Sequence, residues 1–189
     1  MSQVVPSQSL DDPREQLSRP DAHYEILDGQ VQEKPSMGIF STLVSLRLYA
    51  LLASHVDTEQ LGAVVHEALF VLDANRPLKR SPDVAFVSAE RWPLTRSIPA
   101  EGDWEVVPDL AIEVISPNDV ERDIEGKLLE YFEAGVKQVW HVRPLVQNVT
   151  VYRSLRDVRI FTADDHIDAG ELLPGFRAPL GPIFRASWR

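Results

Sequence analysis

Apolar and polar residues along this 189-residue chain follow two different periods. Short alternating runs at residues 24–27 and 31–33 flank Asp28-Gly29, a pair that strongly indicates a β-hairpin. From residue 39 to residue 56 the apolar positions recur at helical spacing. The pattern therefore predicts a hairpin followed by a helix. Residues 1–20 show no such period and are expected to be a flexible arm.

The rest of the chain predicts five strands and one helix. The expected strands are residues 63–72, 83–87, 110–115, 138–142 and 149–152. The predicted helix, residues 120–134, has one apolar face, with Asp119 as its cap and Gly135 at its end. Residues 75–80 are expected to be a loop, residues 88–107 an irregular surface insertion, and the segment after the last strand a capping tail.

This order of elements predicts an α/β fold, as one domain over residues 21–189. The strand at 110–115 is almost continuously apolar and should be central and buried on both faces. The following helix and the strand at 138–142 complete a parallel crossover, which is expected to be right-handed. We therefore expect a mixed β-sheet flanked by helices.

Composition excludes several classes of site. The chain has no cysteine, which rules out disulfides, thiolate zinc sites and cysteine nucleophiles and fits a reducing cytosol. Its formal net charge of −10 argues against a surface that attracts nucleic acid everywhere, but suits a site that first recruits divalent cations. Arg47 and Glu113 break the longest apolar stretches, so no membrane span is expected. With no recognisable targeting signal, we expect a soluble, cytoplasmic protein.

Two acidic residues, Asp83 and Glu113, lie in apolar runs that predict buried strands. A carboxylate there loses its hydration and must be paired, protonated or bound to a cation. Neighbouring strands can place the two side by side, where a cation between them would relieve their repulsion. Carboxylate oxygens suit Mg²⁺, which would polarise a phosphate and lower the pKa of an attacking water. Lys127, on the following helix, could reach back to stabilise developing charge or to help orient the water.

Each of these residues also has a structural interpretation. Asp83 could cap the turn after Pro82, Glu113 could form a buried salt bridge with Lys127, and Lys127 could be a solvated helix residue. Asp109 shares the strand face of Glu113 and could be a metal ligand, but an Asp at the start of a strand usually satisfies backbone groups.

Other candidate groups give weaker signals. Glu67, in the strand predicted at 63–72, could face the same site. His141 is interpreted as a hydrogen-bonded core histidine rather than a ligand, and the five histidines show no metal spacing. The chain has no Gly-rich phosphate loop and no Gly-x-Ser-x-Gly elbow, so P-loop and serine-hydrolase chemistry lack support.

Six short segments stand in a specific order from about residue 22 to residue 153. They are YEILDG (24–29), SPDVAFV (81–87), PDLAIEVISP (108–117), DxxxKxxxY (123–131), AGVxxVW (134–140) and VTVY (149–152). Together they resemble the Uma2-like proteins, also called DUF820, a family of restriction-endonuclease-like proteins. The resemblance implies a PD-(D/E)xK nuclease-like fold.

The resemblance also implies roles for particular residues. The family's acidic pair falls on Asp83 and Glu113, and Glu25 falls on an early glutamate that is an added ligand or orienting group. The general nuclease motif has lysine two residues after the glutamate, where this chain has Ile115, and a helical lysine at the position of Lys127 is similar to the family pattern.

This chain departs from its relatives at three further places. Gln30 and Arg143 stand where relatives often carry Glu and Asp, and Met37-Gly38 replace a histidine that often opens the first helix. These departures leave the acidic pair intact and bear on substrate contacts.

We therefore expect a Mg²⁺- or Mn²⁺-dependent endonuclease acting on DNA. Asp83 and Glu113 would hold the metal, and Lys127 and Glu25 would complete the site. A homodimer would supply two sites for the two strands of a duplex. One alternative is a catalytically inactive module that keeps the nuclease fold to bind nucleic acid or protein, and another is a purely structural role for Asp83 and Glu113.

Overall fold

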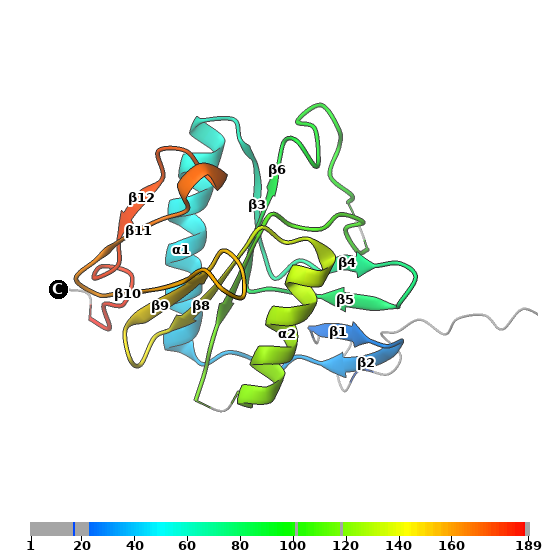
Figure 1. Cartoon of the computed structure of the whole chain (residues 1–189), viewed down its shortest axis with the longest axis horizontal. Helices are drawn as coiled ribbons and strands as arrows, with labels where there is room; N and C mark the ends of the chain where they lie inside the picture. The colour runs from blue at the N-terminus through cyan, green and yellow to red at the C-terminus, as the bar shows by residue number, and fades with distance from the viewer. Residues whose placement is uncertain (1–16, 18–22, 101, 118, 188–189) are drawn as a thin grey trace, which may run out of the picture.

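The computed structural model describes residues 17, 23–100, 102–117 and 119–187. The arm predicted at residues 1–20 lies outside these residues except for Leu17, so it remains a prediction, as does the single domain over 21–189. The described strands form three sheets, of six, four and two strands, which Figure 1 shows together with the two long helices.

The largest sheet has the strand order β10-β9-β8-β7-β6-β3. Its strands are β3 (Gly62–His66), β6 (Val84–Ser88), β7 (Leu110–Val114), β8 (Gln138–Arg143), β9 (Asn148–Tyr152) and β10 (Val158–Thr162). β7 and β8 are parallel, and all other neighbours are antiparallel. Every residue of β7 is buried, as its apolar sequence predicted.

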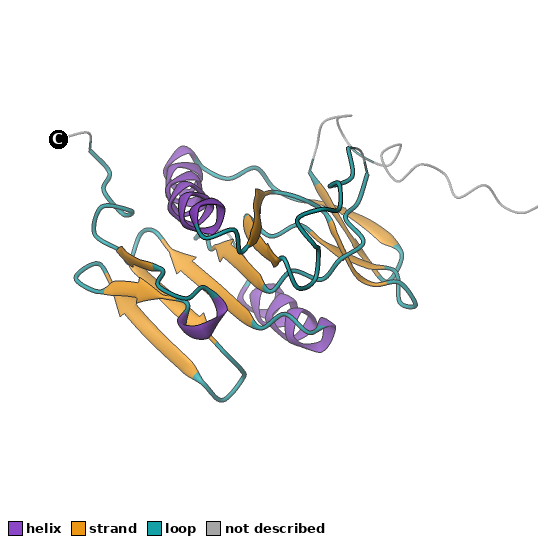
Figure 2. Cartoon of the chain, turned by 90° about the horizontal axis from the view of Figure 1, so that it is seen from above, coloured by secondary structure: helices purple, strands orange, loops and turns teal. Residues whose placement is uncertain are grey.

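The helices α1 (Ile39–Thr58) and α2 (Glu121–Ala134) cover opposite faces of this sheet (Figure 2). Alternation along each strand decides which side chains meet which helix. On β6, Val84 and Phe86 belong to the core beneath α1, whereas Ala85 and Val87 belong to the core beneath α2. The expected fold, a mixed sheet flanked by helices, is confirmed.

The boundaries of α2 are set differently at its two ends. Gly135 ends the helix with a left-handed φ of 94°, as predicted. The predicted cap is wrong, because Val120 occupies the cap position and makes no side-chain hydrogen bond there. Oδ2 of Asp119 instead accepts a hydrogen bond from the N–H of Ser116 at 2.6 Å, which closes the turn between β7 and α2.

A second sheet has the strand order β2-β1-β5-β4. Its strands are β1 (Tyr24–Leu27), β2 (Gln30–Glu33), β4 (Phe70–Asp73) and β5 (Leu78–Arg80). β1 and β2 form the predicted hairpin, in which Asp28 and Gly29 have φ values of 49° and 79°. Two consecutive positive φ values are typical of a type I′ turn, which explains the Asp-Gly pair.

Two predictions around this sheet are wrong. The single strand expected at 63–72 is divided into β3 and β4, because Glu67 adopts a positive φ of 51° and the chain passes from one sheet to the other. The loop expected at 75–80 contains β5, which buries Leu78 and Arg80 and pairs with β4 on one side and, through Lys79, with β1 on the other. Two of the three residues of β5, Lys79 and Arg80, are cationic, so the pattern of apolar residues did not indicate a strand here.

Segments predicted to be peripheral contribute to the core. The insertion at 88–107 buries Trp92 and Trp104, and Trp104 forms a β-bridge with Phe70. After β10 the tail forms the two-stranded sheet of β11 (His166–Asp168) and β12 (Arg177–Pro179), with the 3-10 helix η2 (Gly170–Leu172) between them. The tail closes the core beneath α1 with Ile167, Leu173, Phe176, Leu180, Ile183 and Phe184. It is therefore part of the core and not a cap.

α1 is long and apolar enough to meet the length and composition criteria of a membrane span, contrary to the expectation that no stretch would. In this fold one of its faces is fully buried against the sheet through Val44, Leu48, Leu52 and Val56. Arg47 donates hydrogen bonds from Nη1 to the carbonyl oxygens of Ile183 and Arg185 at 2.9 and 2.6 Å. α1 therefore acts here as a core helix.

Candidate active site

The two strand carboxylates lie next to each other in the large sheet. Asp83 directly precedes β6, Glu113 lies on β7, and the pairing of Val84 with Ile112 makes these strands neighbours. Both residues are almost completely buried, with 2% of Asp83 and 6% of Glu113 exposed. Oδ2 of Asp83 accepts a hydrogen bond from the N–H of Val114 at 2.6 Å, which fixes this side chain against β7.

Lys127 reaches the pair from α2. Its Nζ lies 3.9 Å from Oε2 of Glu113 and 3.1 Å from Oε1 of Glu25. One turn further along the same helix face, the hydroxyl of Tyr131 donates a hydrogen bond to Oε1 of Glu113 at 2.6 Å. α2 therefore supplies both an ammonium and a hydroxyl to the two carboxylates of Glu25 and Glu113.

Glu25 enters the site from β1, in the second sheet. Its Oε2 accepts a hydrogen bond from Nη1 of Arg80 at 2.7 Å, and its Oε1 accepts one from the N–H of Ser81 at 3.2 Å. Arg80 also donates from Nε to Oε2 of Glu130, on α2, at 2.7 Å. Glu25 and Arg80 therefore connect the second sheet to α2 at the site.

Lys34 is a member of the site that the sequence analysis missed. Its Nζ lies 2.6 Å from Oδ1 of Asp83 and 2.8 Å from the carbonyl oxygen of Ser81. Lys34 follows β2 directly, in the connection to α1, where no strand or helix period places it against β6. Its only sequence signal is its position at the end of the hairpin that carries Glu25. We call Glu25, Asp83 and Glu113, with Lys34 and Lys127, the carboxylate cluster.

Burial and charge oppose each other within the carboxylate cluster. Burial alone would raise the pKa of Glu25, but the nearby cations, Lys127 first, outweigh it and lower this pKa. Burial raises the pKa of Glu113 against the pull of Lys127 and Lys34. Burial would lower the pKa of Lys34, yet attraction to Asp83 and Glu113 raises it. Glu113 therefore holds a proton more readily than Glu25 does.

Asp109 lies at the opposite end of β7 from the cluster. Its Oδ1 lies 3.0 Å from Nε of Arg91 and 2.9 Å from Nζ of Lys137, and its Oδ2 accepts a hydrogen bond from the N–H of Ser88 at 2.8 Å. These partners lower the pKa of Asp109 although burial opposes them. Asp109 therefore fastens the starts of β7 and β8 to the end of β6 and does not join Glu113.

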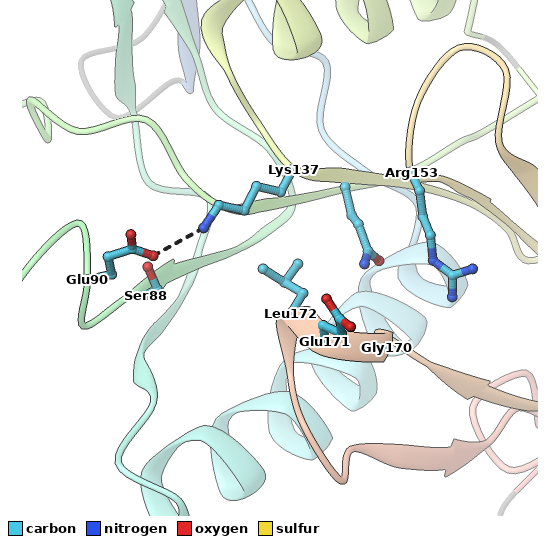
Figure 3. Close-up of a pocket in the computed structure, with 8 residues that line it drawn as sticks. Ser88, Glu90, Lys137, Arg153, Gly170, Glu171 and Leu172 are labelled. Atoms are coloured by element: carbon cyan, nitrogen blue, oxygen red, sulfur yellow. Dashed lines mark hydrogen bonds and ion pairs between the residues drawn. The ribbon is translucent and has the colours of Figure 1, made fainter.

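A pocket of about 680 Å³ opens at this same end of the sheet (Figure 3). It is lined by Ser88, Glu90, Lys137, Gln138, Arg153, Gly170, Glu171 and Leu172, and so by no residue of the carboxylate cluster. Figure 3 shows Lys137 directed toward Glu90, whose Oε2 lies 3.4 Å from Nζ. Arg153 is likewise paired, with Asp168 at 3.4 Å. The pocket is therefore separate from the site and its cations already have acidic partners.

The side chain of Glu67 does not join the cluster. Its Oε2 lies 3.5 Å from Nε2 of His23 and 3.6 Å from Nδ1 of His66. Its backbone N–H donates to the carbonyl oxygen of Asp83 at 3.2 Å, which links the turn after β3 to the start of β6. Glu67 therefore supports the backbone beside the site.

His141 lies beside Glu113, its partner in the parallel pairing of β7 and β8. It is buried as predicted, but the predicted hydrogen bonds are absent, since neither ring nitrogen has a partner among the described residues. Burial, with smaller effects of Arg143 and Lys127, lowers the pKa of His141 to about 4. His141 is therefore a neutral imidazole in an edge-to-face contact with Tyr152.

The donor chemistry of the cluster suits a hard divalent cation. Asp83 and Glu113 offer carboxylate oxygens, which Mg²⁺ and Mn²⁺ prefer. Within the described residues, no three His, Cys, Asp or Glu side chains are arranged to hold a metal ion. Lys34 already contacts Oδ1 of Asp83, and Tyr131 contacts Oε1 of Glu113. The two carboxylates are therefore suitable ligands for such an ion, but the ion would have to compete with Lys34 and Tyr131 for their oxygens.

Comparisons with known proteins bear on this arrangement. The model of the Uma2 family, described as "Putative restriction endonuclease", matches residues 11–181. The crystal structure of "a putative nuclease belonging to DUF820" from Anabaena variabilis matches with a TM-score of 0.77 and 18% identity, over 94% of this chain and 98% of that chain. A search of curated proteins gives no match. The structural likeness shows a shared fold and the family model spans most of the chain, so this protein belongs to the Uma2 family of restriction-endonuclease-like proteins.

Proposed function

We propose that this protein is a metal-dependent endonuclease that hydrolyses DNA phosphodiester bonds. The family assignment indicates a restriction-endonuclease-like nuclease. The observation that carries the finer proposal is the convergence of Glu25, Asp83, Glu113 and Lys127, from separate parts of the chain, in one buried cluster. Buried ion pairs add little to stability, because desolvation offsets their attraction, so a functional reason for this cluster is favoured.

Asp83 and Glu113 are the residues that would hold Mg²⁺ or Mn²⁺. Such an ion, when bound, polarises the phosphate and lowers the pKa of a water molecule. Tyr131 fixes the orientation of Glu113 through its hydroxyl, and the N–H of Val114 does the same for Asp83. The chain therefore holds both carboxylates in defined positions before any substrate arrives.

Lys127 stabilises the negative charge that develops on the phosphate. Its ammonium lies close to Glu113, and Glu25 orients it through a contact of 3.1 Å. In the reaction water gives up one proton as its oxygen bonds to phosphorus, the bond from phosphorus to the sugar oxygen breaks, and that sugar oxygen takes up one proton. A homodimer remains part of this proposal for duplex DNA, because two strands need two sites.

Plasmid cleavage with Mg²⁺ or Mn²⁺ tests the proposed activity. Asp83→Asn and Glu113→Gln should each lower the cleavage rate at least about 100-fold, since each removes a charged metal ligand. Glu90→Gln is the matched control, because Glu90 is an exposed carboxylate at the other end of the sheet. Failure of the wild type to cleave, or equal cleavage by all three variants, would contradict the proposal.

A second candidate is an interaction module that keeps the fold without catalysis. It is favoured by the contacts of Asp83, whose two oxygens are already engaged by Lys34 and by the N–H of Val114. Calorimetry separates the candidates. Binding of Mn²⁺ that is lost in Asp83→Asn supports the enzyme, whereas DNA binding that is independent of metal and unaffected by this substitution supports the module.

A further inference from the structure

The ammonium of Lys34 lies against the carboxylate of Asp83, one of the two proposed metal ligands. It contacts Oδ1 of Asp83 at 2.6 Å and the carbonyl oxygen of Ser81 at 2.8 Å. Only 11% of this side chain and 3% of the Asp83 side chain are exposed. A lysine held by two acceptors in a buried position is a defined part of the site rather than a surface residue.

A divalent ion and this ammonium cannot both contact Oδ1 of Asp83 without strong repulsion. A magnesium-sized ion lies roughly 2.1 Å from a carboxylate oxygen. With Nζ at 2.6 Å from the same oxygen, the two cations would be at most about 5 Å apart in a buried site. Oδ2 offers no easy alternative, because it already accepts the N–H of Val114 at 2.6 Å.

The charge balance of the site strengthens this competition. Five carboxylates and four cations form ion pairs in and beside the cluster: Glu25, Asp28, Asp83, Glu113 and Glu130, with Lys34, Arg76, Arg80 and Lys127. When all are ionised, only one negative charge is uncompensated, which is a weak attraction for a divalent ion. Release of Lys34 from Asp83 removes one of these cations from direct contact and so increases that attraction.

We propose that Lys34 is the resident counter-cation of the metal site, and that a divalent ion gains Asp83 only by displacing its ammonium. This inference rests on the proposed metal site. It assigns to Lys34 a role distinct from that of Lys127, which pairs with Glu25 and Glu113, whereas Asp83 pairs with Lys34. Lys34 keeps Asp83 neutralised in the metal-free protein and sets the affinity of the site for metal.

Calorimetry with Mn²⁺ alone tests the competition. Lys34→Met should bind Mn²⁺ about tenfold more tightly than the wild type or better, because a competing charge is lost. Lys79→Met is the matched control, since Lys79 also pairs with a half-buried aspartate, Asp103, outside the cluster, and its Mn²⁺ affinity should equal that of the wild type. Equal or weaker binding by Lys34→Met overturns the inference and leaves the metal site standing. No binding by either protein overturns the metal site and the inference together.

A measurement on the wild type covers the case in which Lys34→Met does not fold. Reductive methylation followed by mass spectrometry reports how accessible each lysine ammonium is. Saturating Mn²⁺ should increase the modification of Lys34 severalfold and leave that of Lys79 unchanged. Bound Mn²⁺ with no change in the modification of Lys34 overturns the displacement.

Discussion

At the scale of the residue, the acids of the carboxylate cluster have different electrostatic environments. Glu25 receives hydrogen bonds or ion pairs from Arg80, Lys127 and the N–H of Ser81, so its ionised form is stabilised. Glu113 is as buried as Glu25 but receives a neutral hydroxyl and only a longer contact from Lys127, so burial dominates and raises its pKa. Burial and neighbouring charges therefore shift the pKa values of these two glutamates in opposite directions.

Glu25 should make stability depend on pH on the acid side. Its pKa in the folded protein is lower than its ordinary value of 4.5, so its contribution is present above that value and is lost as pH falls through the folded pKa. Urea unfolding from pH 7 to about pH 3 should show a smaller loss of unfolding free energy in Glu25→Gln than in the wild type. Parallel pH profiles for the two proteins would contradict this role.

The hydroxyl of Tyr131 should stabilise the buried carboxylate of Glu113. Tyr131→Phe removes the hydroxyl that Glu113 accepts at 2.6 Å and leaves a buried carboxylate oxygen without that partner, at a cost of about 1–3 kcal/mol. In Glu113→Gln the same substitution should cost less, and the difference measures the coupling between the two side chains. Chemical unfolding of the four proteins checks this, and additive effects would show that the contact contributes nothing.

At the scale of the element, periodic segments were predictable and contacts between elements were not. The hairpin, α1, β7 and α2 follow from spacing that each segment carries by itself. β5 was missed because Lys79 and Arg80 conceal it, and the turn at Glu67 was missed because its conformation depends on two sheets meeting. Lys34 was missed for the same reason, since its contact with Asp83 depends on the pairing of the hairpin with β5, just before Asp83.

α2 contains a glycine, Gly126, at a position where alanine should make the folded protein more stable. Gly126 lies in the helix interior next to Lys127, and a Cβ atom added there meets nothing within 4 Å. Gly126→Ala should raise the unfolding free energy by about 0.5–1 kcal/mol, because glycine loses more backbone entropy on folding. Gly62→Ala is the opposing control, since its Cβ would lie 2.1 Å from the carbonyl oxygen of Val87. Thermal unfolding measures both, and a destabilised Gly126→Ala would show that this turn of α2 is constrained by the site.

At the scale of the whole molecule, the large sheet separates two regions with different tasks. The α2 side carries the carboxylate cluster, and the α1 side is an apolar core without such a cluster among the described residues. The C-terminal tail belongs to that second region, although it lies far from α1 in sequence. Its short strands gave little sequence signal, because their apolar residues match neither a helix nor a long strand. Stability should therefore depend on a segment that forms no part of the site.

Leu173 tests this division of the molecule. It is fully buried beneath α1, so Leu173→Ala should lower the unfolding free energy by about 2–5 kcal/mol through lost burial and a residual cavity. Leu155→Ala is the control, because that leucine is 54% exposed, and it should change stability by less than about 0.5 kcal/mol. Below the unfolding temperature, Leu173→Ala should bind Mn²⁺ as the wild type does, since the cluster lies on the other face of the sheet. Weakened Mn²⁺ binding by the folded variant would show that the two faces are coupled.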